Sequence, residues 1–230
     1  MAEHIGIVAC SAEGAALCYR TICLEALAVM GEHNHPEITM NCIPLARHMA
    51  FIDAPDDWDG VAELMLESCR KVAAAGASFA ICPDNTIHQA LPMVVPRSPI
   101  PWLHTAEVVA EEARRLGFKR LGILGTRYLM EGPVYPGALA KYGIEWRTPP
   151  RAEREMINTA IFKELVNAVF TDTTRSMFHQ RIRELAAEGC DAAVLGCTEI
   201  PLIVRPDEAA LPTLDSTRLL ARAAVRRAVA

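Results

Sequence analysis

Two ionisable side chains each stand directly after a short apolar run of this chain. Asp84 follows the run at 79–83, and Cys197 follows the run at 192–196. A buried parallel strand of such residues delivers the side chain behind it to the carboxyl edge of a sheet, where α/β proteins hold their sites. The cysteine can transfer a proton once its thiol is ionised, and the aspartate can do so if burial raises its pKa toward neutrality. The chemistry predicted for the pair is acid–base proton transfer.

The two runs belong to an internal repeat. Aligned on the runs, Asp84 faces Cys197. A second pair of segments agrees, since His-Ile-Gly-Ile-Val-Ala at 4–9 matches Arg-Leu-Gly-Ile-Leu-Gly at 120–125, at about the same offset. We therefore predict two halves of similar plan, each with one of the two groups at a strand end.

Strands must alternate with helices to position these groups, and the pattern of apolar residues with glycine and proline boundaries indicates that they do. Such alternation specifies parallel sheets with helices on both faces, so the predicted fold class is α/β. The first domain takes in 1–103 and 213–230 and is discontinuous, the second takes in 104–212, and the active site lies in the cleft between them. The expected elements are strands at 4–9, 37–42, 79–84, 120–125, 144–147 and 192–197, and helices at 13–30, 57–75, 105–116, 135–142, 154–169, 173–188 and 215–229, with an irregular proline-rich run at 92–101.

Composition excludes several classes of partner. The 230 residues carry a formal charge of −5 with basic residues scattered, which argues against nucleic acid. Half of the residues are apolar, yet no apolar run approaches the roughly 20 residues that span a bilayer. The N-terminus lacks the basic and long apolar segments of an export signal. We expect a cytoplasmic protein with no membrane partner.

Neither a metal nor a cofactor is predicted. The eight cysteines fall at no regular spacing and include no C-x-x-C pair. His33 and His35 lie in a polar stretch and are more typical of a solvated turn than of a metal site. The chain has no G-x-G-x-x-G after its first strand and no Walker A string, so nucleotide cofactors are not indicated either.

Polar groups beside the pair are candidates for holding a substrate carboxylate. Asn85, Thr86 and Thr198 follow the two ionisable groups directly, and their side chains with the backbone N–H groups of the turns can bind such an anion. The N–H groups of Cys10 and Ser11 can join them, because these residues end the first predicted strand.

Four further side chains have both a functional and a structural interpretation. Arg47 is a candidate to hold a distal carboxylate with its guanidinium fork, although a surface arginine is commoner, and Lys163 is a similar candidate. His88 either supports the site or packs and caps the helix that begins near Thr86, and Glu199 either orients a neighbour or pairs with an arginine. Asp84 itself can be a helix cap instead of a catalytic group.

The string Leu-Gly-Cys-Thr-Glu-Ile-Pro-Leu at 195–202 resembles the second active-site motif of the cofactor-independent aspartate/glutamate racemase superfamily, aspartate racemase branch. Asn-Thr-Ile-His at 85–88 is similar to the tail of the first motif, Gly-Thr-Arg-Tyr at 125–128 to a strand-end loop, and Asp-Ser-Thr-Arg at 215–218 to the start of the last helix. The resemblance covers nearly the whole chain. It implies two flavodoxin-like, Rossmann-like parallel-sheet domains related by pseudo-twofold symmetry, no cofactor, a homodimer, and Thr126 as a substrate contact.

Two departures from the family pattern bear on function. The resembled racemases take and give the α-proton with two cysteines, whereas the first of these positions is Asp84 here. Cys82 is no substitute, because its head would lie about 6–7 Å back along the strand. The segment 9–13 also stands where the family has a glycine-rich loop, so the substrate can differ.

The resemblance implies a racemase-like isomerase that abstracts the α-proton of a small acidic amino acid with the Asp84/Cys197 pair. An aspartate and a cysteine differ in intrinsic pKa, so one-sided chemistry is also compatible: a lyase, hydrolase or decarboxylase on a related carboxylic acid. A third possibility is a protein that binds a small carboxylate without catalysis.

Overall fold

The computed structural model describes residues 2–53 and 57–230, and the chain divides into two compact units. Unit 1 comprises Met1–Thr105 and Thr217–Ala230, and unit 2 comprises Ala106–Ser216. The boundaries predicted at 103/104 and 212/213 lie a few residues from these divisions. Each unit contains a four-stranded parallel sheet with helices, which confirms the α/β class.

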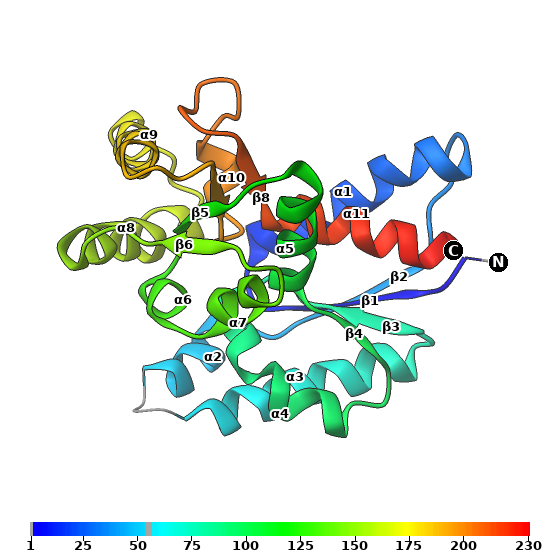
Figure 1. The fold of residues 1–230 in the computed structure, drawn as a ribbon. Coiled ribbons are helices and arrows are strands. Elements are labelled where there is room, and N and C mark those ends of the chain that lie inside the picture. The colour runs from blue at the N-terminus through cyan, green and yellow to red at the C-terminus, as the bar shows by residue number, and fades with distance from the viewer. Residues whose placement is uncertain (1, 54–56) are drawn as a thin grey trace. The chain divides into compact units, whose positions relative to one another are not determined.

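Unit 1 is built on a sheet of strand order β2-β1-β3-β4. Figure 1 shows α1 and α11 on one face of this sheet and α3 and α4 on the other. The chain ends meet in this unit, since Glu3 N–H donates to Ala228 O over 2.7 Å. The elements are β1 (Ile5–Ala9), α1 (Ala12–Met30), β2 (Ile38–Cys42), α2 (Leu45–Ile52), α3 (Trp58–Ala74), β3 (Phe79–Ile81), η1 (Thr86–Ala90), α4 (Leu91–Val94), η2 (Val95–Arg97), β4 (Trp102–Leu103) and α11 (Ser216–Val229).

Unit 2 repeats the plan with strand order β6-β5-β7-β8. Helix α9 packs on the two central strands, β5 and β7. The elements are α5 (Thr105–Leu116), β5 (Arg120–Leu124), α6 (Arg127–Glu131), α7 (Val134–Ala140), β6 (Glu145–Arg147), α8 (Arg151–Lys163), η3 (Leu165–Asn167), α9 (Asp172–Ala187), β7 (Ala192–Leu195), α10 (Ile200–Ile203) and β8 (Thr213–Asp215).

Equivalent glycines allow the helix layers to approach both sheets. A Cβ on Gly6 of β1 would lie 2.7 Å from Val72 Cγ2 of α3, and a Cβ on Gly122 of β5 would lie 2.6 Å from Leu185 Cδ1 of α9. Real Cβ atoms do not approach so closely, so both positions require glycine for close packing. The internal repeat read from the sequence is therefore a structural repeat.

Several sequence-based boundaries were wrong for local reasons. The helix expected at 154–169 is α8, which begins behind Pro150 and ends at Lys163, and Ala168 then takes a left-handed conformation with φ of 56°. The helix expected at 173–188 is α9, and Thr171 caps it by accepting from Thr174 N–H over 3.1 Å. Proline is tolerated in the first turn of a helix, so the run at 92–101 is mostly helical, as α4 and η2.

Short elements escaped the pattern altogether. The strands β4 and β8 and the helices α2, α6 and α10 span two to eight residues each, too few for a periodicity to stand out. Asp215, predicted to start the last helix, ends β8 instead. In the described part of the chain, no helix has both the length and the apolar surface that crossing a membrane requires.

Candidate active site

In unit 1 the carboxyl ends of two neighbouring strands bring a thiol and a carboxylate together. Strand β1 pairs with β3, so Cys10 behind one strand lies beside Asp84 behind the other. Cys10 Sγ donates to Asp84 Oδ2 over 3.1 Å, and Ile87 N–H donates to Oδ1 over 3.0 Å. Cys10 is only 3% exposed, whereas Asp84 is partly exposed. Asp84 therefore stabilises the first turn of η1, as its alternative role predicted, and also accepts a hydrogen bond from the Cys10 thiol.

A buried histidine fixes the loop that carries Asp84. His88 Nε2 accepts from Thr105 N–H over 3.2 Å, so the ring proton sits on Nδ1, which donates to Asp84 O over 2.6 Å. The ring is 1% exposed and packs edge-on against His104. Burial, with a smaller contribution from His104, lowers the pKa of His88 to about 3. The ring stays neutral and anchors the loop.

The thiol two residues before Asp84 has a different environment. Cys82 is fully buried, and its Sγ lies 3.9 Å from Asp84 O. Burial, together with the neighbouring Asp84 carboxylate, raises the pKa of Cys82 well above its usual range. A thiol that resists ionisation is a poor nucleophile or base, so the geometry gives Cys82 a packing role.

In unit 2 the same edge of the sheet holds the reverse arrangement. Cys197 Sγ, 7% exposed, donates to Glu199 Oε2 over 3.0 Å, and Thr198 Oγ1 donates to the same oxygen over 2.8 Å. Glu199 is 1% exposed, and its Oε1 has no hydrogen-bond partner among the described residues. A buried carboxylate with a free oxygen is costly to keep, which is a sign of a functional group. The partners of Glu199 in the structure are Cys197 and Thr198, rather than the arginine that was the alternative.

Two glycines and two hydroxyls shape the turn that holds Cys197. A Cβ on Gly196 would lie 2.8 Å from Leu124 O, and one on Gly125 would lie 3.1 Å from Gly196 O, so the turns after β5 and β7 touch. Behind them, Ser216 Oγ donates to Leu195 O over 2.8 Å and hydrogen-bonds Tyr135, which is fully buried. Burial raises the pKa of Tyr135, so it stays protonated. Backbone and hydroxyl groups therefore fix the conformation of the turn that carries Cys197.

Of four smaller candidates at these strand ends, three are buried and Ser11 is half-buried. Asn85 and Thr86 follow Asp84 at 3% and 8% exposure. Thr126, 6% exposed, caps α6 by accepting from Leu129 N–H over 3.2 Å, and Ser11 stands at the N-cap of α1. All four lie immediately behind strands or beside the two acid–base groups within their own unit.

The two candidate cations have surface contacts. Arg47 on α2 donates to Glu67 Oε2 over 3.2 Å, and its side chain is half exposed. Lys163 is exposed at the end of α8. The structure does not place either residue beside the acid–base pair of its own unit.

Sequence reasoning missed the role of the Cys10 side chain and of Tyr135. The sequence predicts a role only for the backbone N–H of Cys10, because a cysteine at a strand end does not by itself indicate a functional side chain. The repeat contains a signal after all, since the alignment of 4–9 with 120–125 places Cys10 opposite Thr126. For Tyr135 the sequence contains no such signal.

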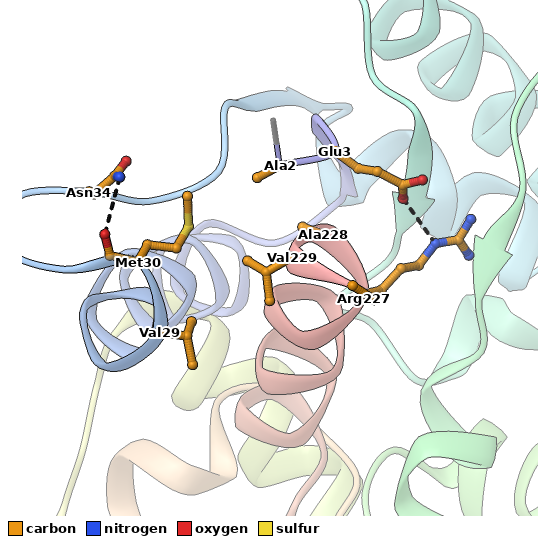
Figure 2. Close-up of a pocket in the computed structure, with 9 residues that line it drawn as sticks. Ala2, Glu3, Val29, Met30, Asn34, Arg227, Ala228 and Val229 are labelled. Carbon is orange, nitrogen blue, oxygen red and sulfur yellow. Dashed lines mark hydrogen bonds and ion pairs between the residues drawn. The ribbon is translucent and has the colours of Figure 1, made fainter.

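Two surface pockets lie away from these clusters. In unit 1, a groove of about 670 Å³ is lined by Ala2, Glu3, Val29, Met30, Asn34 and residues 227–230. Figure 2 shows its polar contacts, Arg227 Nε to Glu3 Oε2 at 3.4 Å and Asn34 Nδ2 to Met30 O at 3.2 Å. Glu3 precedes β1 and Cys10 follows it, so the groove lies at the opposite end of the strand, roughly 20 Å away. The second pocket lies between α8 and α9 and includes none of the candidate residues.

Over residues 2–53 and 57–230, no three histidine, cysteine, aspartate or glutamate side chains are grouped so that they could hold a metal ion. The two thiol–carboxylate pairs each offer too few ligands.

Comparison with known proteins gives one consistent answer. A sequence profile described as Asp/Glu/Hydantoin racemase matches residues 8–224. The broad specificity amino-acid racemase RacX of Bacillus subtilis is 21% identical over 183 residues, which cover 76% of this chain and 75% of RacX.

Solved structures agree with the sequence comparison. A Yersinia pestis protein described as a candidate Asp/Glu racemase is similar with a TM-score of 0.87 and 30% identity, covering 99% of this chain and 100% of its own. An aspartate racemase homologue of Pyrococcus horikoshii, 24% identical over the full length of both chains, has a TM-score of 0.83.

Proposed function

Because this chain belongs to the Asp/Glu/Hydantoin racemase family, we propose that it is a cofactor-independent racemase of a small acidic amino acid. Membership in a family of racemases makes it an enzyme of the isomerase class. The observation that carries the proposal is the placement of Asp84 and Cys197 at equivalent strand ends. Each stands three residues beyond a paired position of the central strands, Ile81 with Ile7 in unit 1 and Val194 with Ile123 in unit 2.

In the proposed reaction the two groups serve opposite faces of one α-carbon. One group takes the α-proton, the C–H electron pair passes into the carboxylate as an enediolate, and the other group returns a proton to the opposite face. Positioned acids and bases of this kind contribute about 10²–10⁴-fold each. Asp84 and Cys197 exchange roles when the substrate enters as the other enantiomer.

Glu199 supports the unit 2 half of this reaction. Cys197 must lose its proton before it can act as a base, and the hydrogen bond to Glu199 gives that proton a place to go. Thr198 donates to the same oxygen and holds the carboxylate in position. We therefore assign Glu199 the role of a buried proton acceptor behind the thiol.

The substrate carboxylates require hydrogen-bond donors around the pair. Asn85, Thr86 and the N–H groups of Thr198, Cys10 and Ser11 are the proposed donors to the α-carboxylate and its enediolate. Thr126 is the proposed contact at the end of β5. Arg47 and Lys163 are the candidates for a distal carboxylate, which requires Arg47 to exchange its ion pair with Glu67 for one with substrate.

The proposal also covers the cellular location and the oligomeric state of the enzyme. All eight cysteines are free thiols, as a reducing cytoplasm maintains them. A homodimer is proposed on the side of α1, where Tyr19, Leu24 and Leu27 are 44%, 54% and 41% exposed. Light scattering checks the dimer, with Leu24→Glu expected to give monomers.

A deuterium experiment tests the proposed function. The protein is incubated in D2O with the enantiomers of aspartate, glutamate and related dicarboxylic acids, and NMR with chiral analysis follows α-deuterium and configuration. Deuterium incorporation with inversion on an acidic amino acid is expected, and it should persist after dialysis against EDTA. A cleaved product would instead support a lyase, hydrolase or decarboxylase, and binding without exchange a non-catalytic protein.

A further inference from the structure

The acid–base group of unit 1 includes two side chains, Asp84 and Cys10. Asp84 Oδ1 and Oδ2 each accept a hydrogen bond within the unit, from Ile87 N–H and from the Cys10 thiol. A carboxylate that accepts at both oxygens is stabilised in its ionised form. Such a group is ready to take a proton, but it has none of its own to give.

Racemisation in both directions needs an acid as well as a base in unit 1. When Cys197 has taken the α-proton, unit 1 must supply one. An ionisable proton lies beside the Asp84 carboxylate on Cys10 Sγ, 3.1 Å from Oδ2. With ordinary pKa values near 8.5 for a thiol and 3.9 for an aspartate, the one proton that the pair shares at neutral pH resides on sulfur.

We propose that Cys10 is the proton store of unit 1, acting through Asp84, and this inference rests on the proposed racemase function. Cys10 is 3% exposed and Asp84 is partly exposed, so the thiol lies behind the carboxylate and the proton passes through it.

The proton moves in two steps, from Cys10 to Asp84 and from Asp84 to the α-carbon. The Sγ–H bond of Cys10 breaks as an O–H bond forms on Asp84 Oδ2, which leaves a thiolate. This O–H bond then breaks as the C–H bond of the α-carbon forms, and Asp84 is again a carboxylate. Overall a thiol proton moves to a carbanion, which is downhill because the α-carbon of an amino acid is a far weaker acid than a thiol. Water reprotonates the thiolate, or the reverse reaction does so.

Unit 2 supplies an independent parallel. There the outer group is a thiol, Cys197, and the buried group behind it is a carboxylate, Glu199, at 3.0 Å. Both units thus pair a thiol with a carboxylate across a single hydrogen bond, with the buried partner exposed by 3% or less. The other thiol near Asp84, Cys82, hydrogen-bonds the backbone carbonyl of Asp84 rather than its carboxylate and provides a matched control.

Three variants test the proposal: Cys10→Ala, Cys10→Ser and Cys82→Ala. We expect Cys10→Ala to slow inversion with deuterium incorporation about 100-fold or more for the substrate enantiomer from which Cys197 removes the α-proton, because unit 1 then must give a proton. Cys10→Ser keeps a hydrogen-bond donor but its hydroxyl is a much weaker acid, so it should not restore the rate. Cys82→Ala should stay within about threefold of the parent, with unchanged thermal unfolding as the check on folding. Full activity of Cys10→Ala, or full rescue by Cys10→Ser, would overturn the proton-store role.

A second readout does not depend on turnover. Iodoacetamide labelling with peptide mass spectrometry measures the reactivity of each thiol at pH 8. Asp84→Asn removes the carboxylate beside Cys10, so the Cys10 thiolate forms more readily and should be labelled at least 10-fold faster, while Cys190, a buried thiol of unit 2, is unchanged. An unchanged Cys10 rate would contradict the pair. If the parent shows no exchange on any acid but this shift is seen, the racemase proposal fails while the thiol–carboxylate pair stands.

Discussion

Units 1 and 2 place the same three chemical groups at the same three positions of one sheet plan, but in a different order. In unit 1 the end of β1 carries Cys10, the end of β3 carries Asp84, and Thr86 follows two residues later. In unit 2 the equivalent positions are Thr126 behind β5, Cys197 behind β7 and Glu199 two residues later. Thiol, carboxylate and hydroxyl are all retained, although no residue matches its counterpart.

The comparison shows that the pairing, rather than the residue at one position, is what the two units share. A thiol hydrogen-bonded to a carboxylate over 3.0–3.1 Å occurs in each. The order matters for chemistry, because the group in front is a carboxylate in unit 1 and a thiol in unit 2. The predictions below break or sharpen this parallel, beginning with the largest expected effect.

Removing the front thiol of unit 2 should have the largest effect. Cys197→Ala takes away a proton-transfer group, so racemisation should fall by about 10⁴-fold, near the upper end for a general acid or base. Chiral chromatography of product measures the rate. The control is Cys190→Ala, which removes another buried thiol of the same unit. Equal losses in both variants would mean that the effect is structural.

Making the two front groups identical should increase the rate. Asp84→Cys places thiols at both equivalent strand ends, and a thiolate is a stronger base than a carboxylate by about 4–5 pKa units. We expect roughly a 10-fold gain in inversion of an acidic amino acid, measured with deuterium incorporation. Asp207→Cys adds a thiol on an exposed loop and should change nothing. A loss of exchange in Asp84→Cys would show that the carboxylate itself is needed.

The rear carboxylate of unit 2 should contribute less than the front thiol. Glu199→Gln keeps the size of the side chain but cannot take the Cys197 proton, so turnover should fall by roughly 10-fold to 100-fold. The exposed Glu188→Gln is the matched control. Unchanged steady-state kinetics in Glu199→Gln would leave the carboxylate with only a packing role.

The most modest prediction concerns the stability of unit 1 in acid. Burial lowers the pKa of His88 to about 3 and that of His48 to about 4. The unfolded chain binds these protons below about pH 6.5 whereas the folded chain does not, so stability is full above that pH and is lost as the pH falls toward 4. Each histidine contributes a slope of up to about 1.4 kcal/mol per pH unit.

Urea unfolding at several pH values between 4 and 7 measures this slope. His88→Gln should flatten it by one histidine's share, because glutamine does not titrate. His33→Asn, at an exposed position, should leave it unchanged. A parent protein whose unfolding free energy is constant over this range would contradict the burial of neutral histidines.

The repeat, the α/β class and the strands that precede Asp84 and Cys197 could all be predicted, because long apolar periodicities and a rare motif specify them. The predicted ends of these strands were wrong, since β3 ends at Ile81 and β7 at Leu195. The pairing across β1 and β3 could not be predicted. It depends on the register of Ile7 with Ile81, which brings Cys10 beside Asp84 from 74 residues away. Register is a property of the folded sheet, so the sequence around Cys10 does not indicate that its thiol contacts Asp84.

Other differences from the sequence prediction have the same origin. Glu164 accepts hydrogen bonds from Thr171 and Thr174, a tertiary contact that accompanies the end of α8 before the predicted residue 169. The tautomer of His88 is set by Thr105, 17 residues on. Local propensity gives no access to partners this distant in sequence.

The central claim is that the two units serve opposite faces of one α-carbon, and exchange resolved by enantiomer tests it most directly. The parent, Asp84→Asn and Cys197→Ala are each incubated in D2O with the pure L and the pure D substrate, and initial α-deuterium incorporation is measured with Asp207→Asn as control. The account predicts complementary defects: Asp84→Asn slows proton removal from one enantiomer by about 10²–10⁴-fold, and Cys197→Ala slows it from the other. Loss of exchange from the same enantiomer in both variants would contradict the claim, since both groups would then act on one face.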